Sequence, residues 1–243
     1  MPEIKNEKGT IMVKFPRRRQ NGAEVKKKED LEEKIVLADT EVDDAAFQSF
    51  FGDVVKKLPN SAAAIIMKTF DSTKVKAESL LATTRSRFDS VFDPFLKGVD
   101  ETTQKKSHGI IHMASLSAAI IGLSPIPFSD AFLLVPVQLV MMARLHKIFG
   151  QSWSEGIGKS MTKELVVVSF GRSAVGNILK FIPVVGTIGG GAVNAVVAMA
   201  ITESLGWVTV KMLNDGEDIF EQVMSFKGQF NTLFKALQSA NKK

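Results

Sequence analysis

The chain of 243 residues contains no cysteine and no tyrosine, and it has only three histidines. Without cysteine, disulfide bonds, thiolate catalysis and cysteine-ligated metals are excluded. His108, His112 and His146 are too few and too scattered to predict a metal site. No serine–histidine–acid set and no paired carboxylates stand at a convincing spacing. The sequence therefore predicts no catalytic residue, no cofactor and no metal, and we expect a protein that is not an enzyme.

Charge is scarce in the middle of the chain. Residues 107–212 carry 11 charged side chains in 106 positions, whereas residues 41–106 carry 20 in 66 positions. Residues 213–243 carry 8 charged side chains in 31 positions, and residues 1–40 carry 18 in 40 positions. The pattern predicts four segments: a charged, largely disordered arm (1–40), amphipathic helices (41–101), an apolar helical core domain (102–212) and a C-terminal amphipathic helix (213–243).

The N-terminal arm has two basic clusters and no apolar run of the length that a signal peptide needs. We therefore expect a cytoplasmic protein. Each basic residue near an anionic membrane surface adds about 1 kcal/mol of binding, although neighbouring acidic residues dilute the effect; a solvated tail is the alternative. The candidates for a lipid tether are Arg17, Arg18, Arg19, Lys26, Lys27 and Lys28.

Helices flank the apolar core. Residues 43–58 have aspartates at the start and lysines at the end, which suits the helix dipole, and Pro59 closes the helix. Asn60 or Ser61 is then expected to cap a long amphipathic helix over residues 61–97. Residues 216–240 show a second apolar stripe and predict a last amphipathic helix.

A helical hairpin is predicted around residues 125–130. Pro125 and Pro127 end a helix over 102–123, and Ser129 or Asp130 caps the next one, which Pro136 could kink early. That second helix ends near Arg144 with Gly150 as its C-cap. The uncharged arms, residues 109–123 and 131–143, are 15 and 13 residues long, whereas a membrane span needs about 20. The sequence therefore predicts a tight turn between antiparallel helices that pack against protein or dip into a membrane.

The strongest candidate for a membrane span is the uncharged stretch from residue 181 to 202, which has 22 residues. Gly186 and Gly190 form a G-x-x-x-G pattern, which permits close helix contact in membranes. Pro183 and the glycines instead favour a turn, followed by a tightly packed soluble helix over residues 192–213. Glu203 lies in that apolar helix and needs a partner such as Arg172.

Ten residues in and beside the apolar block are candidates for structural or partner contacts. They are Pro125, Pro127, Asp130, Arg144, Gly150, Pro183, Gly186, Gly190, Glu203 and Gly206.

One tempting motif, "GIGKS" at residues 156–160, lacks the pattern of a phosphate loop. The position that requires the first glycine holds Trp153, and no strand precedes the segment. We therefore expect no binding of GTP or ATP at this place.

Two stretches carry a resemblance to a known family. They are "PIPFSDAFLLVPVQLVMMARLHKIFG" at residues 125–150 and "KFIPVVGTIGGGAVNAVVAMAITESLGW" at residues 180–207. Their order resembles helical domains of unknown function found beside, or fused to, small Era-like GTPases in bacteria, among them the YcjF-type inner-membrane proteins. The resemblance implies a helical, membrane-associated module with a GTPase partner. Because no GTPase domain precedes the block, such a GTPase acts from a separate chain.

The expected fold is all-α: a helical bundle with a central apolar hairpin and flanking amphipathic helices. The expected function is that of a membrane-associated scaffold or partner module for a small GTPase at the inner membrane, with membrane lipid as a partner. Two alternatives stay open: a pore-forming or membrane-remodelling protein that inserts its apolar hairpin, and a soluble helical protein that buries the block in a homo-oligomer. No specific nucleic-acid binding is expected from a net charge of +5.

Overall fold

The computed structural model describes residues 43–92, 96–126, 131–154, 190–219 and 221–239. All described residues belong to the unit Glu41–Lys243. The predicted N-terminal arm, with its six tether candidates, lies outside them.

The described residues form helices and no strand, which confirms the predicted all-α class. The elements are α2 (Asp44–Val55), α3 (Asn60–Phe92), α4 (Glu101–Leu123), the 3₁₀ helix η2 (Ala131–Leu134), α5 (Val135–Ile148), α8 (Gly190–Asn214) and α9 (Val223–Ser239).

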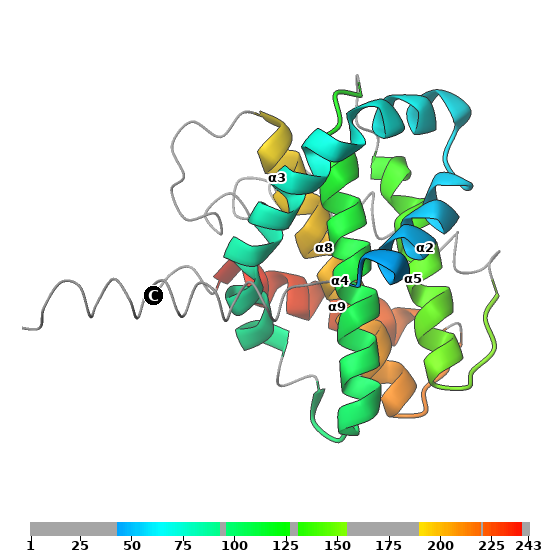
Figure 1. Cartoon of the computed structure of the whole chain (residues 1–243). Helices are drawn as coiled ribbons and strands as arrows, with labels where there is room; N and C mark the ends of the chain where they lie inside the picture. Colours follow the sequence, from blue (N-terminus) through cyan, green and yellow to red (C-terminus); the bar gives the residue numbers. More distant parts are fainter. Residues whose placement is uncertain (1–42, 93–95, 127–130, 155–189, 220, 240–243) are drawn as a thin grey trace, which may run out of the picture. The chain divides into compact units, whose positions relative to one another are not determined.

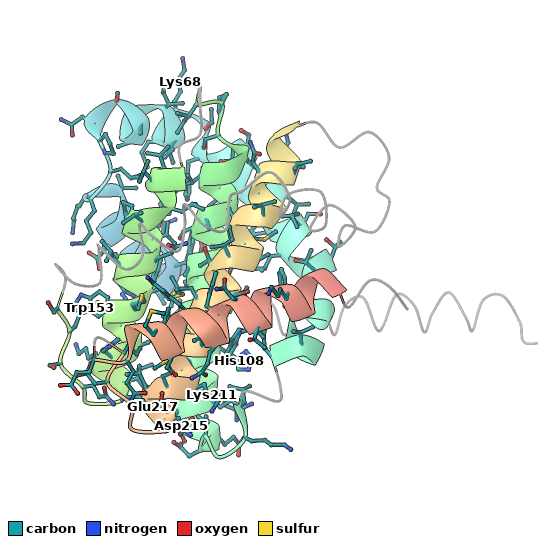
Figure 2. The ribbon with its side chains drawn as sticks, turned by 180° about the vertical axis from the view of Figure 1, so that it is seen from behind. Lys68, His108, Trp153, Lys211, Asp215 and Glu217 are labelled. Carbon is teal, nitrogen blue, oxygen red and sulfur yellow. The ribbon has the colours of Figure 1, made fainter. Side chains whose placement is uncertain are left out.

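Helices α4 and α8 form the centre of the bundle and pack extensively against each other. Helices α2, α3 and α5 surround this pair (Figure 1), and Figure 2 shows α9 lying across α8 on the opposite side. The apolar residues of α4 and α8 are therefore covered by α2, α3, α5 and α9. The largest fully buried side chains are Trp207, Phe47, Phe50, Phe92, Phe226 and Phe230.

The amphipathic helices α2 and α3 arise largely as the sequence predicts. Asp43 caps α2 by accepting a hydrogen bond from the Ala45 amide at 3.0 Å. The predicted cap of α3 by Asn60 or Ser61 is wrong, because Asn60 is already helical and the Pro59 carbonyl accepts the Ala63 amide at 2.9 Å. The apolar face of α3 packs on the core through Ile66, Ala77, Leu81, Phe88 and Phe92.

The predicted hairpin is present as α4 and α5, which pack together and run in opposite directions (Figure 1). Helix α4 ends at Leu123 with Ser124 as C-cap, and Pro125 follows as an exposed residue. The predicted capping residues Ser129 and Asp130 lie outside the described residues, as does Pro127. Pro136 does not kink a continuous helix; it stands at the start of α5, where η2 gives way to α-helix.

Gly150 ends α5 as predicted. Its φ is 67°, a left-handed conformation that favours glycine. The Gly150 amide donates to the Lys147 carbonyl at 3.2 Å, and the Gln151 amide donates to the His146 carbonyl at 3.0 Å. These two bonds make a Schellman motif.

Helix α9 begins later than the sequence predicts. Residues 215–217 close α8 with a second Schellman motif, in which Gly216 has a φ of 74° and the Glu217 amide donates to the Met212 carbonyl at 2.9 Å. Because this turn occupies the start of the predicted helix, α9 starts at Val223 rather than at residue 216. Its apolar stripe still faces the core through Phe226, Phe230 and Leu233.

Candidate functional site

The interface between α4 and α8 is built from small residues. A Cβ added at Gly122 would lie 2.7 Å from the Cα of Ala195, and a Cβ at Gly206 would lie 2.7 Å from Cγ1 of Ile111. Residue 122 of α4 thus meets residue 195 of α8, and residue 111 meets residue 206. The two helices are therefore antiparallel, and the absence of side chains at the two glycines sets how closely they approach.

A buried carboxylate lies in this interface. The side chain of Glu203 accepts two hydrogen bonds, one from Ser115 Oγ of α4 at 2.7 Å and one from Trp207 Nε1 of α8 at 2.9 Å. Glu203 is only 1% exposed. A carboxylate is buried at acceptable cost only when donors satisfy it, and here one donor comes from each helix. Glu203 therefore joins α4 to α8 in the middle of an apolar core.

Aromatic rings surround the Trp207 side of this cluster. The His108 ring lies edge-on to Trp207 with ring centroids 4.5 Å apart, and the Phe92 ring lies 5.9 Å from Trp207. His112 lies one turn further along α4, 5.6 Å from His108. This packing holds the indole in place, so the Glu203 side chain is fixed between the two helices.

A second polar site joins α2 to α5. Arg144 Nη2 lies 2.8 Å from Asp53 Oδ2, and the guanidinium stacks over the Phe50 ring at 5.0 Å. The hydrogen bond from Arg144 lowers the pKa of Asp53 below its usual value, and Lys56 at 3.4 Å acts in the same direction. The Asp53 side chain is 45% exposed, so solvent screening keeps this pair weak.

His146 is buried near the end of α5. Its Nδ1 lies 2.8 Å from the Met142 carbonyl oxygen and donates to it, and its ring lies 4.9 Å from that of Trp153. Burial lowers the pKa of His146 below its ordinary value of 6.5, although the bond to Met142 and the charge of Asp218 act in the opposite direction. The folded state therefore favours a neutral imidazole.

The predicted site residues lie in different parts of the fold. Glu203 and Gly206 lie together in the α4–α8 interface, whereas Arg144 and Gly150 lie on or just after α5. Gly190 is the first residue of α8. Asp130, Pro183 and Gly186 lie outside the described residues, so the predicted G-x-x-x-G contact is not described, nor is Arg172, the expected partner of Glu203.

Three residues of the interface were not singled out from the sequence: Gly122, Ser115 and Trp207. A signal for the first two was present, because Ser115, Ala118 and Gly122 follow each other at spacings of three and four and so share one helix face. Trp207 stands four residues after Glu203 and therefore one turn away on the same side of α8. Within the described segments, no group of three histidine or acidic residues could hold a metal ion.

Helix α8 is also the described helix with the composition of a membrane span. Residues Gly191–Asn214 form 24 residues that are long and apolar enough to cross a bilayer. In this fold, 89% of the apolar window is buried inside the bundle. The predicted span over residues 181–202 lies partly outside the described residues, whereas the predicted helix over residues 192–213 agrees with α8.

The comparisons with known proteins identify the family. The model of DUF697, described as a domain of unknown function, matches residues 94–239. The chain belongs to the DUF697 family. The matched DUF697 region contains α4, η2, α5, α8 and α9, and hence the Glu203 cluster and both helices of the small-residue interface. This agrees with the resemblance to helical domains of unknown function.

A curated relative of this DUF697 chain is magnetosome membrane protein 22 of Magnetospirillum gryphiswaldense. The two sequences are 33% identical over 112 residues, which cover 44% of this chain and 56% of the relative. The chain thus spans about half the length of the curated relative that it matches. No solved structure matches the chain.

Proposed function

We propose that this DUF697 protein is a non-enzymatic, membrane-associated helical module that acts at the cytoplasmic face of the inner membrane as a scaffold or partner for a small GTPase. The observation that carries the membrane part is α8, a helix of span length whose residues pack through glycine and alanine onto α4. Small residues at helix contacts are typical of membrane helix pairs. The relative named as a magnetosome membrane protein supports the same conclusion.

The non-enzymatic part is supported by how the buried polar groups are used. Glu203 is the charged residue buried most deeply in the interface, and it accepts bonds from Ser115 and Trp207 across the helix pair. A catalytic acid or base must reach a substrate, whereas this carboxylate is enclosed. Its role in the proposal is to hold α4 and α8 in register.

The GTPase part rests on the resemblance of residues 125–150 and 180–207 to domains that accompany small GTPases. A GTPase that acts in trans should bind this chain with different affinity in its GTP-bound and GDP-bound forms. The chain itself should bind neither GTP nor ATP in calorimetry. Micromolar binding that is abolished by Lys159→Ala would contradict this expectation.

One observation favours a second candidate, a protein that inserts into membranes after opening. Helix α8 is buried beneath α3, α4, α5 and α9 in this fold, so contact between α8 and lipid requires the covering helices to move. Liposome flotation followed by carbonate extraction separates the two readings. Peripheral association predicts flotation that carbonate reverses, whereas insertion predicts flotation that resists carbonate. A protein that stays at the bottom of the gradient as a soluble oligomer would contradict both.

A further inference from the structure

The surface between α2 and α5 holds a pocket of about 500 Å³. Its floor is aliphatic, formed by Leu139, Val140 and Ala143 of α5, and Trp153 forms a wall just after α5. Four ionisable side chains complete the lining: Asp53, Lys56, Lys57 and Arg144. Three of these are basic and one is acidic, so the pocket has a formal charge of +2 over an apolar floor.

The three basic side chains of the pocket differ in how firmly they are held and in how exposed they are. Arg144 is held in one position by Asp53 at 2.8 Å and by the Phe50 ring beneath it. Its described hydrogen bonds use Nη2, whereas a guanidinium has five N–H donors. Lys56 is 78% exposed, and Lys57 is exposed beside it at the end of α2. A fixed guanidinium and two exposed ammonium groups therefore line the same pocket.

We propose that this pocket binds the headgroup of an anionic phospholipid, with the phosphate near Arg144 and the two lysines and the glycerol backbone over the aliphatic floor. A free phosphate ion would leave the floor and the indole uncovered, whereas a phospholipid carries apolar acyl chains on the glycerol that is esterified to its phosphate. Tryptophan, lysine and arginine are also the residues that anchor proteins at the membrane–water interface. The inference rests on the proposed membrane association and names the lipid class and the contact.

The proposed lipid site lets the protein bind a membrane surface while α8 stays buried in the bundle. With 89% of the apolar window of α8 enclosed, attachment in this folded state needs a surface site. The pocket lies on α2 and α5, and the amphipathic cover of α8 does not have to open for a lipid to enter it.

The test compares two double variants with the same change of charge. Lys56→Gln with Lys57→Gln removes two charges from the pocket, and Lys68→Gln with Lys76→Gln removes two exposed charges from α3. Figure 2 shows Lys68 at the top of the view, well away from Trp153. Each full-length protein is floated with phosphatidylcholine vesicles that contain or lack phosphatidylglycerol. Circular dichroism and urea midpoints check that the variants fold alike.

We expect wild type and the α3 variant to float with the anionic vesicles and the pocket variant to bind about thirtyfold more weakly, from about 1 kcal/mol for each basic residue near the surface. If both variants lose the same affinity for anionic vesicles, the attraction is diffuse. If neither variant loses affinity, the protein binds lipid at another place. Either result overturns the headgroup site but leaves the proposed function standing. If wild type floats with neither vesicle, the proposed function fails and the site fails with it.

Trp153 supplies an independent readout, because the chain has two tryptophans and the other, Trp207, is 1% exposed. A headgroup-labelled nitroxide lipid in anionic vesicles should quench Trp153, and Trp153→Phe should abolish that quenching. Quenching that persists in Trp153→Phe would overturn the site. A last titration adds glycerol phosphate in solution and follows Trp153 emission. If glycerol phosphate shifts this emission as strongly as the vesicles do, the ligand is a soluble phosphate and the lipid proposal is wrong.

Discussion

The contact between Gly122 and the α8 backbone gives the sharpest test of the core. A Cβ at residue 122 would lie 2.7 Å from the Cα and 2.8 Å from the amide nitrogen of Ala195, and 3.0 Å from the carbonyl carbon of Asn194. Non-bonded carbon atoms prefer about 3.5 Å or more. All three neighbours are backbone atoms, so no side-chain rotation can relieve the overlap. Gly122→Ala must therefore displace a turn of α8.

The matched control is Gly109→Ala, on the same helix. A Cβ at Gly109 would meet nothing within 4 Å. Alanine is favoured over glycine in a helix by about 1 kcal/mol, and this gain applies to both variants. The difference between them therefore isolates the steric cost, which for an overpacked core is about 1–3 kcal/mol. We expect Gly109→Ala to be as stable as wild type or more stable, and Gly122→Ala to be less stable than that control by this amount.

The measurement is urea unfolding followed by circular dichroism and by tryptophan fluorescence. The midpoint should fall in Gly122→Ala at an unchanged slope. Ala195→Gly should not rescue it, because the colliding atoms belong to the backbone and remain in glycine. If Gly122→Ala proved as stable as Gly109→Ala, the close approach of α4 and α8 at this point would be wrong.

Three further changes probe the same bundle. Glu203→Ala should cost about 3 kcal/mol or more of unfolding free energy, because two buried donors lose their acceptor, and Ser115→Ala should cost about 1–3 kcal/mol; losses that simply add in a double-mutant cycle would refute direct coupling. Gly206→Ala should lower the unfolding free energy less than Gly122→Ala does, because the atoms near its added Cβ belong to side chains. Adding Ile111→Ala to Gly206→Ala should remove part of the steric cost, and no such effect would contradict the contact between residues 111 and 206. Stability should fall as the pH drops through 6.5, because the pKa of His146 is lowered in the fold and the unfolded chain takes up the proton first. His146→Gln should show a shallower fall across the same pH range, and an equally steep fall would exclude His146 as the cause.

The helices of this protein are predictable because their periodicity is strong. The recurrence of Phe88, Phe92 and other apolar residues sets the buried face of α3, and the Gly150 turn ends α5 where the sequence places it. The start of α9 was not predictable in the same way. The acidic residues near Gly216 suit a helix N-terminus, yet Gly216 instead closes α8 with a left-handed turn.

The site was only half predictable. Glu203 stands out because it is a charge within an apolar helix, but its partner Ser115 is 88 residues away in the chain. Only the register of α4 against α8 brings the two together, and that register depends on where Gly122 and Gly206 allow the backbones to approach. The sequence pointed to Arg172 because charge is the simplest partner for charge. Two neutral donors, Ser115 Oγ and Trp207 Nε1, bind Glu203 within the described residues, and Arg172 lies outside them.

Hydropathy could not decide the environment of α8, because a bilayer and a protein core both remove apolar surface from water. The Glu203 cluster constrains the answer. If α8 left the bundle alone, Glu203 would keep Trp207, which lies on the same helix, and would lose Ser115, which lies on α4. A charged side chain at the centre of a membrane helix costs about 2.5–3.5 kcal/mol even by the most lenient scale, so losing a donor there is unfavourable. The glycine contacts at both ends of the interface would be lost as well. Transfer of α8 with α4 still attached keeps all of these interactions, so any form of this protein that enters the bilayer should do so with the α4–α8 pair as its unit.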